Sequence, residues 1–128
     1  MLALEVTLAA QDETPVLVFD EVDAGVGGRL GEVVGQALWS LARDHQVLCV
    51  SHLAQVAAYA DAHVKVRKEV RAGRTHVVAE TLAQRDSAAE LAAMLGAGGS
   101  SKSLAAGARE LQTGAADWKA RTGRPRPR

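Results

Sequence analysis

Apolar and polar residues follow one another in blocks along the first half of the chain. Residues 16–19 (VLVF) form a continuous apolar run rich in β-branched side chains, which is typical of a parallel strand covered on both faces. Residues 29–43 repeat apolar side chains at helical spacing, and residues 46–50 (QVLCV) form a second apolar run. These blocks and their short connections predict a βαβ unit with a right-handed crossover, in which Trp39 lies at the partly buried edge of the helix.

The residue pattern in the second half of the chain predicts a β-hairpin. Residues 62–68 alternate apolar and basic side chains, residues 75–82 form another strand pattern, and residues 71–74 (RAGR) make the turn. The hairpin gathers the basic residues Lys65, Arg67, Lys68, Arg71 and Arg74. These charges either protect a sheet edge against aggregation or form a phosphate-contacting patch. We favour edge protection, because no aromatic or amide side chains accompany the charges.

Two helices and a tail are predicted to close the chain. Residues 86–95 and 103–119 have helical patterns, and the second helix carries a stripe of Leu104, Ala108, Leu111 and Ala115. Residues 1–10 are dense in helix formers and have no N-cap signal, which is typical of the second half of a buried helix. The tail at 121–128 (RTGRPRPR) is basic and interrupted by proline, and is expected to be disordered.

Polar residues follow both strands of the predicted βαβ unit. Asp20 and Glu21 come directly after the first strand, and Ser51 and His52 come directly after the second. The carboxyl ends of parallel strands meet at one edge of a sheet, where ligands bind. Paired carboxylates there suit a hydrated Mg²⁺ ion and an activated water. The alternatives are an acidic turn after a core strand, and a helix at 53–60 with Ser51 as its N-cap.

Composition is that of an ordinary globular domain. The chain has 128 residues, of which 48% are hydrophobic, and its formal net charge is +0. No global field therefore recruits nucleic acid, and an aromatic content of 3% disfavours base-stacking platforms. The lone Cys49 excludes an intrachain disulfide framework and agrees with a reducing cytosol. No stretch approaches the apolar length of a bilayer span, so no membrane partner is expected.

The segments VLVFDEVDAGVGG (16–28) and VLCVSHLAQVAAYAD (47–61) resemble the carboxyl-terminal half of the ATPase head of the RecN family. These proteins are bacterial DNA-repair relatives of the SMC proteins, within the ABC-type ATPases. The resemblance runs from Met1 to about Leu111. Residues 19–21 match the Walker B element, residues 22–28 match the D-loop, and Ser51-His52 matches the switch histidine.

The resemblance implies an α/β fold, the carboxyl-terminal lobe of a P-loop NTPase head, with residues 1–118 as the head and 119–128 as the tail. Asp20 would hold Mg²⁺ through water, Glu21 would polarise the water that attacks the γ-phosphate, and His52 would sense that phosphate. The nucleotide-contacting positions would be Asp20, Ser51, Asp23, Gly25, Gly27 and Gly28. Gly27 stands where SMC or ABC heads usually carry Asp, which removes the usual polar D-loop contact across the dimer.

The resemblance also implies partners. The P-loop and the signature sequence of the family lie upstream of Met1, so the chain would be half a head that is inactive by itself. ATP and Mg²⁺ would be its cofactors, and its partners would be the amino-terminal half of the head, a second head in an ATP-sandwiched homodimer, and DNA. Its function would be recombinational repair of double-strand breaks in the bacterial cytoplasm, at the nucleoid. Alternatives are a head fragment of another SMC or ABC ATPase, or a non-enzymatic DNA-binding or interaction module.

Two further expectations concern the missing half. The segment GAGGSSKS (96–103) nearly matches a P-loop, but it follows a helical run instead of a strand and lies after the Walker B element, so it is excluded as one. A P-loop strand contributed by the other half would lie between the strands at 16–19 and 47–50. Those two strands would then not be neighbours in the complete head, and the isolated chain would be unstable, self-associating, or folded only with the amino-terminal half that supplies the strand.

Overall fold

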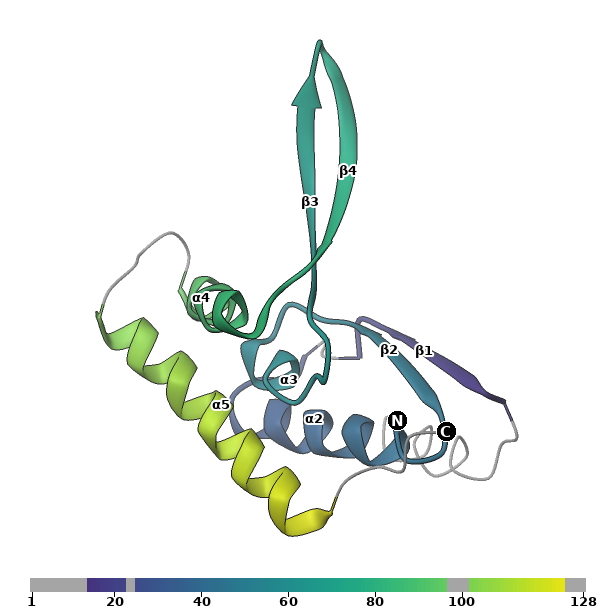
Figure 1. Cartoon of the computed structure of the whole chain (residues 1–128), viewed down its shortest axis with the longest axis vertical. Coiled ribbons are helices and arrows are strands. Elements are labelled where there is room, and N and C mark those ends of the chain that lie inside the picture. The colour runs from purple at the N-terminus through teal and green to yellow at the C-terminus, as the bar shows by residue number, and fades with distance from the viewer. Residues whose placement is uncertain (1–13, 23–24, 97–101, 124–128) are drawn as a thin grey trace.

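The computed structural model describes residues 14–22, 25–96 and 102–123. In chain order the elements are β1 (Val16–Asp20), α2 (Arg29–Leu41), β2 (Gln46–Val50), α3 (Ala54–Ala57), β3 (Val64–Arg71), β4 (Arg74–Thr81), α4 (Gln84–Leu95) and α5 (Lys102–Thr122). The fold is mixed α/β, as expected (Figure 1). The helix expected at residues 1–10 and most of the tail, residues 124–128, lie outside the described residues.

The strands β1 and β2 and the helix α2 form the expected βαβ unit. The two strands pair in parallel over five residue pairs, from Val16–Gln46 to Asp20–Val50. Phe19 and Val47 pack from the sheet against Val34 and Leu38 of α2. This contact buries one face of the sheet under the crossover helix, and it fixes the strands in register because a one-residue slip would turn these side chains to the opposite face.

The expectation that a P-loop strand separates the two strands is wrong. β1 and β2 are direct neighbours and share a continuous hydrogen-bonded ladder. The short connection through α2 brings the second strand back beside the first, which is the usual outcome for consecutive strands of a βαβ unit. A further strand can therefore join this sheet only at an outer edge, beside β1 or beside β2.

The expectation that the strands are covered on both faces is also wrong for the part of the chain that the structure describes. Val16, Val18, Leu48 and Val50 lie on the face opposite α2, and their exposed fractions are 40%, 67%, 51% and 62%. One βαβ unit has one crossover helix, which covers one face only. The apolar run was correctly identified as a strand, but the second layer that its composition predicts is not among the described elements.

The strands β3 and β4 form the expected hairpin. They pair antiparallel over eight residue pairs, from Val64–Thr81 to Arg71–Arg74. The two turn residues, Ala72 and Gly73, have φ angles of 49° and 73°. Positive φ at both positions is the signature of a type I′ turn, which matches the twist of the flanking strands. The hairpin projects away from the helices (Figure 1).

The helices form a small core of their own. Trp39 of α2, Tyr59 and Ala115 of α5 make one buried cluster, and Trp118 packs against it. Trp39 is only 5% exposed, so the expectation of a partly buried edge is corrected. Trp39 is buried because Ala115 and Trp118 of α5 pack against it, and without this cover from α5 its ring would be partly open to solvent. α5 continues to Thr122, so the first residues of the expected tail, 119–122, are helical.

A second cluster joins the other helices. It consists of Ala54 of α3, Leu91 of α4 and Ala108 of α5, all at most 2% exposed. The expected stripe of α5 thus faces the core at Ala108 and Ala115, with Leu111 partly buried against the cluster. Together the two clusters attach α5 along the helical side of the molecule, away from β1 and β2 (Figure 1).

Candidate functional site

The predicted site residues from the two strands meet at one edge of the β1–β2 sheet. Asp20 and Val50 are the last partners of the ladder. Glu21 follows the first directly and Ser51 follows the second, so the acidic pair and the Ser51-His52 pair leave the sheet side by side. Asp20, Glu21 and His52 are all exposed. The structure therefore brings these residues to a common, open edge, as the sequence predicted.

Glu21 has an unusual backbone. Its φ is 51°, in the left-handed region that residues other than glycine seldom adopt. Such a conformation costs about 1–2 kcal/mol for an L-residue and is found disproportionately at functional sites. The sequence pattern gave no indication of this, because Glu is not a typical residue for a left-handed position.

The glycine-rich loop after the acidic pair is only partly described. Asp23 lies outside the described residues. Gly25 and Gly28 have φ angles of 76° and 54°, so both use the conformational freedom of glycine, and Gly28 precedes α2 as its N-cap residue. Gly27 has no positive φ, and a Cβ at that position would meet no atom within 4 Å. Packing within the described chain therefore does not require glycine at position 27.

The structure of the segment after β2 does not match the alternative prediction of a helix at 53–60 with Ser51 as its N-cap residue. The Leu53 N–H donates a hydrogen bond to Ser51 Oγ at 3.0 Å, two residues along the chain. α3 begins only at Ala54, has Leu53 as its N-cap residue, and ends at Ala57. Ser51 thus closes a local turn with Leu53 ahead of α3, and Leu53 instead of Ser51 occupies the N-cap position of that helix.

The acidic pair has the chemistry that a magnesium–nucleotide complex needs. Among the described residues, no three His, Cys, Asp or Glu side chains lie together as a metal-binding group. Mg²⁺ in nucleotide sites is commonly held by one or two carboxylates, several waters and the phosphates themselves. Asp20 and Glu21, exposed at the end of β1, fit that pattern and could hold or orient such an ion and its water.

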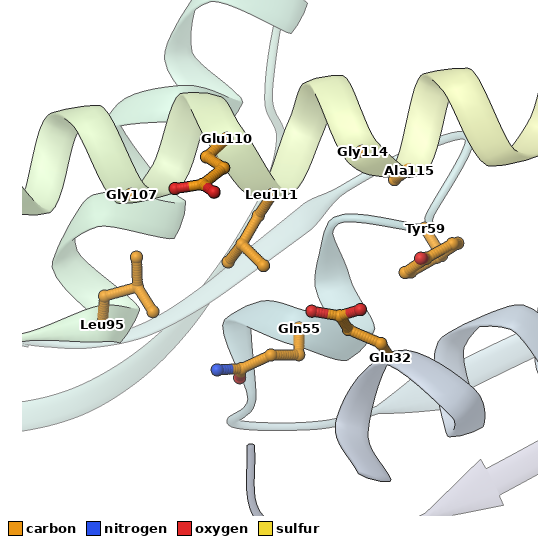
Figure 2. Close-up of a pocket in the computed structure, with 9 residues that line it drawn as sticks. All are labelled: Glu32, Gln55, Tyr59, Leu95, Gly107, Glu110, Leu111, Gly114 and Ala115. Atoms are coloured by element: carbon orange, nitrogen blue, oxygen red, sulfur yellow. The ribbon is translucent and has the colours of Figure 1, made fainter. Parts of the chain in front are cut away.

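A cavity of about 460 Å³ lies elsewhere, among the helices. Its walls are Glu32, Gln55, Tyr59, Leu95, Gly107, Glu110, Leu111, Gly114 and Ala115. Glu32 of α2 and Glu110 of α5 extend into it from different helices (Figure 2). Sequence analysis missed this cavity, because its walls come from segments up to 83 positions apart with no shared motif. None of the predicted site residues lines it.

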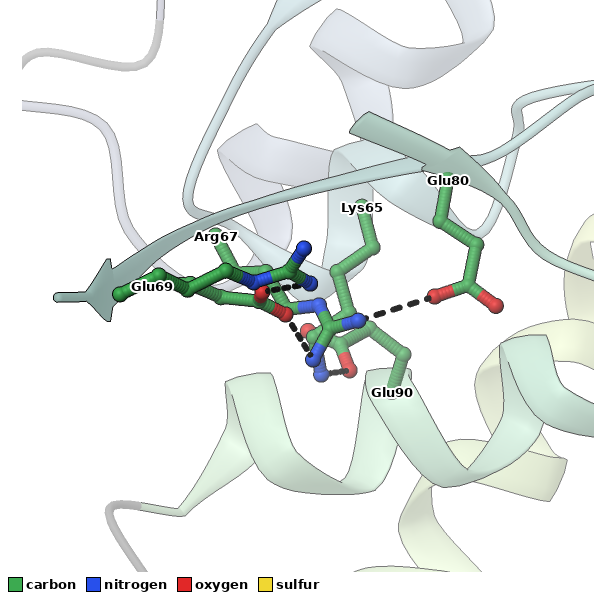
Figure 3. Close-up of polar contacts among 6 residues, drawn as sticks. Lys65, Arg67, Glu69, Glu80 and Glu90 are labelled. Atoms are coloured by element: carbon green, nitrogen blue, oxygen red, sulfur yellow. Dashed lines mark hydrogen bonds and ion pairs between the residues drawn. The ribbon is translucent and has the colours of Figure 1, made fainter. Parts of the chain in front are cut away.

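Three of the five basic residues of the hairpin form ion pairs within the chain. Arg67 forms ion pairs with Glu69 at 2.9 Å and with Glu80 at 3.9 Å, and Arg71 also pairs with Glu69. Lys65 pairs with Glu90 of α4 and so attaches the base of the hairpin to the helices (Figure 3). This arrangement favours edge protection over a phosphate-contacting patch. No helix within the described ranges combines the length and apolarity of a membrane span.

No family model matches the chain. Among curated proteins, the DNA repair protein RecN of Mycobacterium leprae (strain TN) is 52% identical to it over 111 residues, which is 87% of this chain. RecN of Treponema pallidum is 40% identical over 111 residues and also 87% of the chain, and RecN of Bacillus subtilis is 37% identical over 95 residues, 74% of the chain. The chain is homologous to part of RecN.

The match covers only a small part of each RecN relative. It spans 19% of the proteins from M. leprae and T. pallidum and 16% of the protein from B. subtilis. The chain therefore corresponds to about a fifth of the length of the RecN proteins that it matches.

Proposed function

We propose that the chain supplies the Walker B and switch half of an ATPase site in a RecN-like DNA repair protein of the bacterial cytoplasm. The phosphate-binding loop would come from the part of a RecN-length polypeptide that this chain does not contain. ATP and Mg²⁺ are the proposed cofactors, and a second ATP-bound head and DNA are the proposed partners. The support for this proposal is the homology to RecN together with the geometry of one sheet edge.

The proposed chemistry assigns one task to each polar residue. Asp20 would hold Mg²⁺ through water, and the ion would neutralise the charge on the phosphates. Glu21 would orient and polarise the attacking water, and His52 would donate a hydrogen bond to the γ-phosphate. Phosphoryl transfer depends on such positioning and charge stabilisation far more than on covalent chemistry. Ser51 and the loop glycines Gly25, Gly27 and Gly28 would lie close to the nucleotide.

The observation that carries the proposal is the pairing of Asp20 with Val50 at the end of the parallel ladder. It places the carboxylates and the histidine at one edge although about thirty residues separate them in the sequence. The left-handed backbone of Glu21 supports the same assignment, because strained residues persist where function requires them. The openness of the edge agrees with a site whose remaining walls come from another segment.

A chimera tests the proposal. The 111 residues of M. leprae RecN that match this chain would be replaced by the chain itself, so that the rest of the polypeptide is present. We expect the chimera to hydrolyse ATP, and Glu21→Gln to lower turnover at least about a hundredfold while ATP binding persists. Hydrolysis that is equally fast with Gln at position 21 would contradict the role of Glu21.

The structure gives less support to the alternative of a DNA-binding module that acts without ATP. Such a module would need basic side chains available for phosphates, whereas Lys65, Arg67 and Arg71 of the hairpin are ion-paired within the chain. The alternative of another SMC or ABC head is less supported than RecN, because the identities of 52% and 40% are to proteins named RecN.

A further inference from the structure

One face of the projecting hairpin is apolar and exposed. In the antiparallel register, Val64, Val66 and Val70 of β3 lie on the same face as Val77 of β4. Their exposed fractions are 51%, 64%, 73% and 67%. We call these four residues the valine face. Scattered apolar residues on a surface are ordinary, but four exposed valines on one face of a two-stranded hairpin, flanking the single basic residue Lys68, are an unusual concentration.

The opposite face of the hairpin carries charged side chains, several of which form ion pairs within the chain. Lys65, Arg67, Glu69 and Arg71 occupy this face of β3, and their ion pairs run along it and down to Glu90 of α4 (Figure 3). The two faces thus differ in kind. Lys65, Arg67 and Arg71 of the charged face form ion pairs within the chain, and among the described residues no element covers the valine face.

A hairpin of this kind needs a partner for stability. Two antiparallel strands without a further layer are marginally stable in water, because they bury little apolar surface. The hairpin also projects away from the helices (Figure 1). Among the described residues, α4 contacts its base, where Lys65 pairs with Glu90 and Ser87 Oγ lies 3.5 Å from His63 Nδ1. Most of its eight residue pairs thus lie beyond the base that α4 contacts.

We infer that the valine face is a docking surface for the part of a RecN-length polypeptide that this chain lacks. The inference rests on the proposed function, because it assumes that the chain works together with that part. It adds a second contact region, remote from the sheet edge that carries Asp20 and His52. The partner surface is apolar, so that it can cover the exposed valines.

Length and charge argue for this occupant. The matched relatives have about four-fifths of their residues outside the region that this chain covers, which is ample material for a second layer. A nucleic acid is disfavoured, because the face carries a single basic residue, Lys68, among its valines. A second copy of the chain is the remaining apolar occupant, and it becomes an outcome of the test.

The test uses the full chain, co-expressed with M. leprae RecN from which the matched 111 residues have been removed. We expect the two pieces to co-purify, and the hairpin amides to exchange hydrogen more slowly in the complex than in the chain alone. A triple variant, Val66→Thr, Val70→Thr and Val77→Thr, keeps the side-chain shape and the β-propensity but adds hydroxyls. It should weaken the complex at least about tenfold. Arg74→Asp, on the other face of the same hairpin, should leave the affinity unchanged.

The outcomes separate this inference from the proposed function. No complex with the unchanged chain, or equal affinity with the triple threonine variant, would overturn the inference, whatever the chimera does with ATP. A dimer of the isolated chain that the triple variant disperses would identify a second copy as the occupant and overturn it as well. A valine-dependent complex would support the inference even if the chimera fails to hydrolyse ATP, a result that would count against the proposed function alone.

Discussion

Asp20 and Val50 face each other as the last residue pair of the parallel β1–β2 ladder. This pair fixes where the chain leaves the sheet on both strands, and so it determines which residues can meet beyond the edge. The contact of Phe19 and Val47 with α2 holds the ladder in this register. The candidate site is therefore a consequence of core packing one residue away from it.

Replacing His52 should affect hydrolysis more than replacing a histidine at the other end of the same strand. In the chimera with M. leprae RecN, His52→Ala should lower turnover by about a hundredfold, the usual effect of losing one donor to a phosphoryl or oxyanion group. His45 precedes β2, and its Nδ1 lies 2.7 Å from the Thr14 carbonyl oxygen. Steady-state kinetics of His52→Ala and His45→Ala test this, and an equal loss in both would argue against a role for His52.

The backbone of Glu21 predicts an opposition between stability and activity. Glu21→Gly should raise the free energy of unfolding of the isolated chain by up to about 1 kcal/mol, because glycine adopts a φ of 51° without the steric cost. Glu21→Gln keeps that cost and should leave stability within about 0.5 kcal/mol of the parent. Urea unfolding followed by circular dichroism measures both. Destabilisation by more than about 1 kcal/mol, the entropy that glycine adds to the unfolded chain, would show that the left-handed conformation is not strained.

The hairpin turn offers a local test. Ala72 has a φ of 49° where a type I′ turn prefers Asn, so Ala72→Asn should stabilise the hairpin by about 0.5–1 kcal/mol. Gly73→Ala should do the reverse by about 1 kcal/mol, purely through its backbone, since a Cβ at Gly73 would meet no atom within 4 Å. Hydrogen exchange of the amides in β3 and β4 measures both changes. Shifts of the same sign would exclude a type I′ turn.

Two helical glycines should respond oppositely to alanine. A Cβ at Gly35 would lie 2.6 Å from Tyr59 Cδ2, so Gly35→Ala forces the buried Tyr59 ring to move and should cost about 1–3 kcal/mol. A Cβ at Gly114 of α5 would meet nothing within 4 Å, so Gly114→Ala should stabilise the chain by about 0.5–1 kcal/mol through helix propensity. Thermal unfolding tests both predictions, by comparing the Tm of each variant with that of the parent chain. Equal effects would contradict the close packing of α2 under Tyr59.

Local patterns predicted the elements well. The second strand, residues 46–50, has the predicted bounds, and the hairpin turn lies where Arg71–Arg74 placed it. Each of these features depends on apolar runs, helical periods and turn residues within a few positions. The sequence also predicted that Asp20 and Ser51 leave the sheet at the same edge, because the carboxyl ends of parallel strands lie together.

The failed expectations depend on contacts between distant segments. The residues near Trp39 in the sequence do not indicate that Tyr59 and Ala115 cover its ring, so the burial of Trp39 was underestimated. The family resemblance placed a further strand between β1 and β2, whereas the direct α2 crossover makes them neighbours. The left-handed φ of Glu21 has no local signature either, since side-chain type alone would have assigned that position to glycine or asparagine.

The aromatic cluster determines what optical spectroscopy can report about this protein. Both tryptophans of the chain lie in it, with the rings of Trp39 and Trp118 5.6 Å apart and edge to face, and Tyr59 lies 5.7 Å from Trp118. The β1–β2 sheet has Phe19 as its single aromatic residue. Intrinsic fluorescence therefore follows the release of α5 from its neighbours and does not report on the sheet edge. Fluorescence and amide-exchange transitions will coincide only if both parts of the molecule unfold as one cooperative unit.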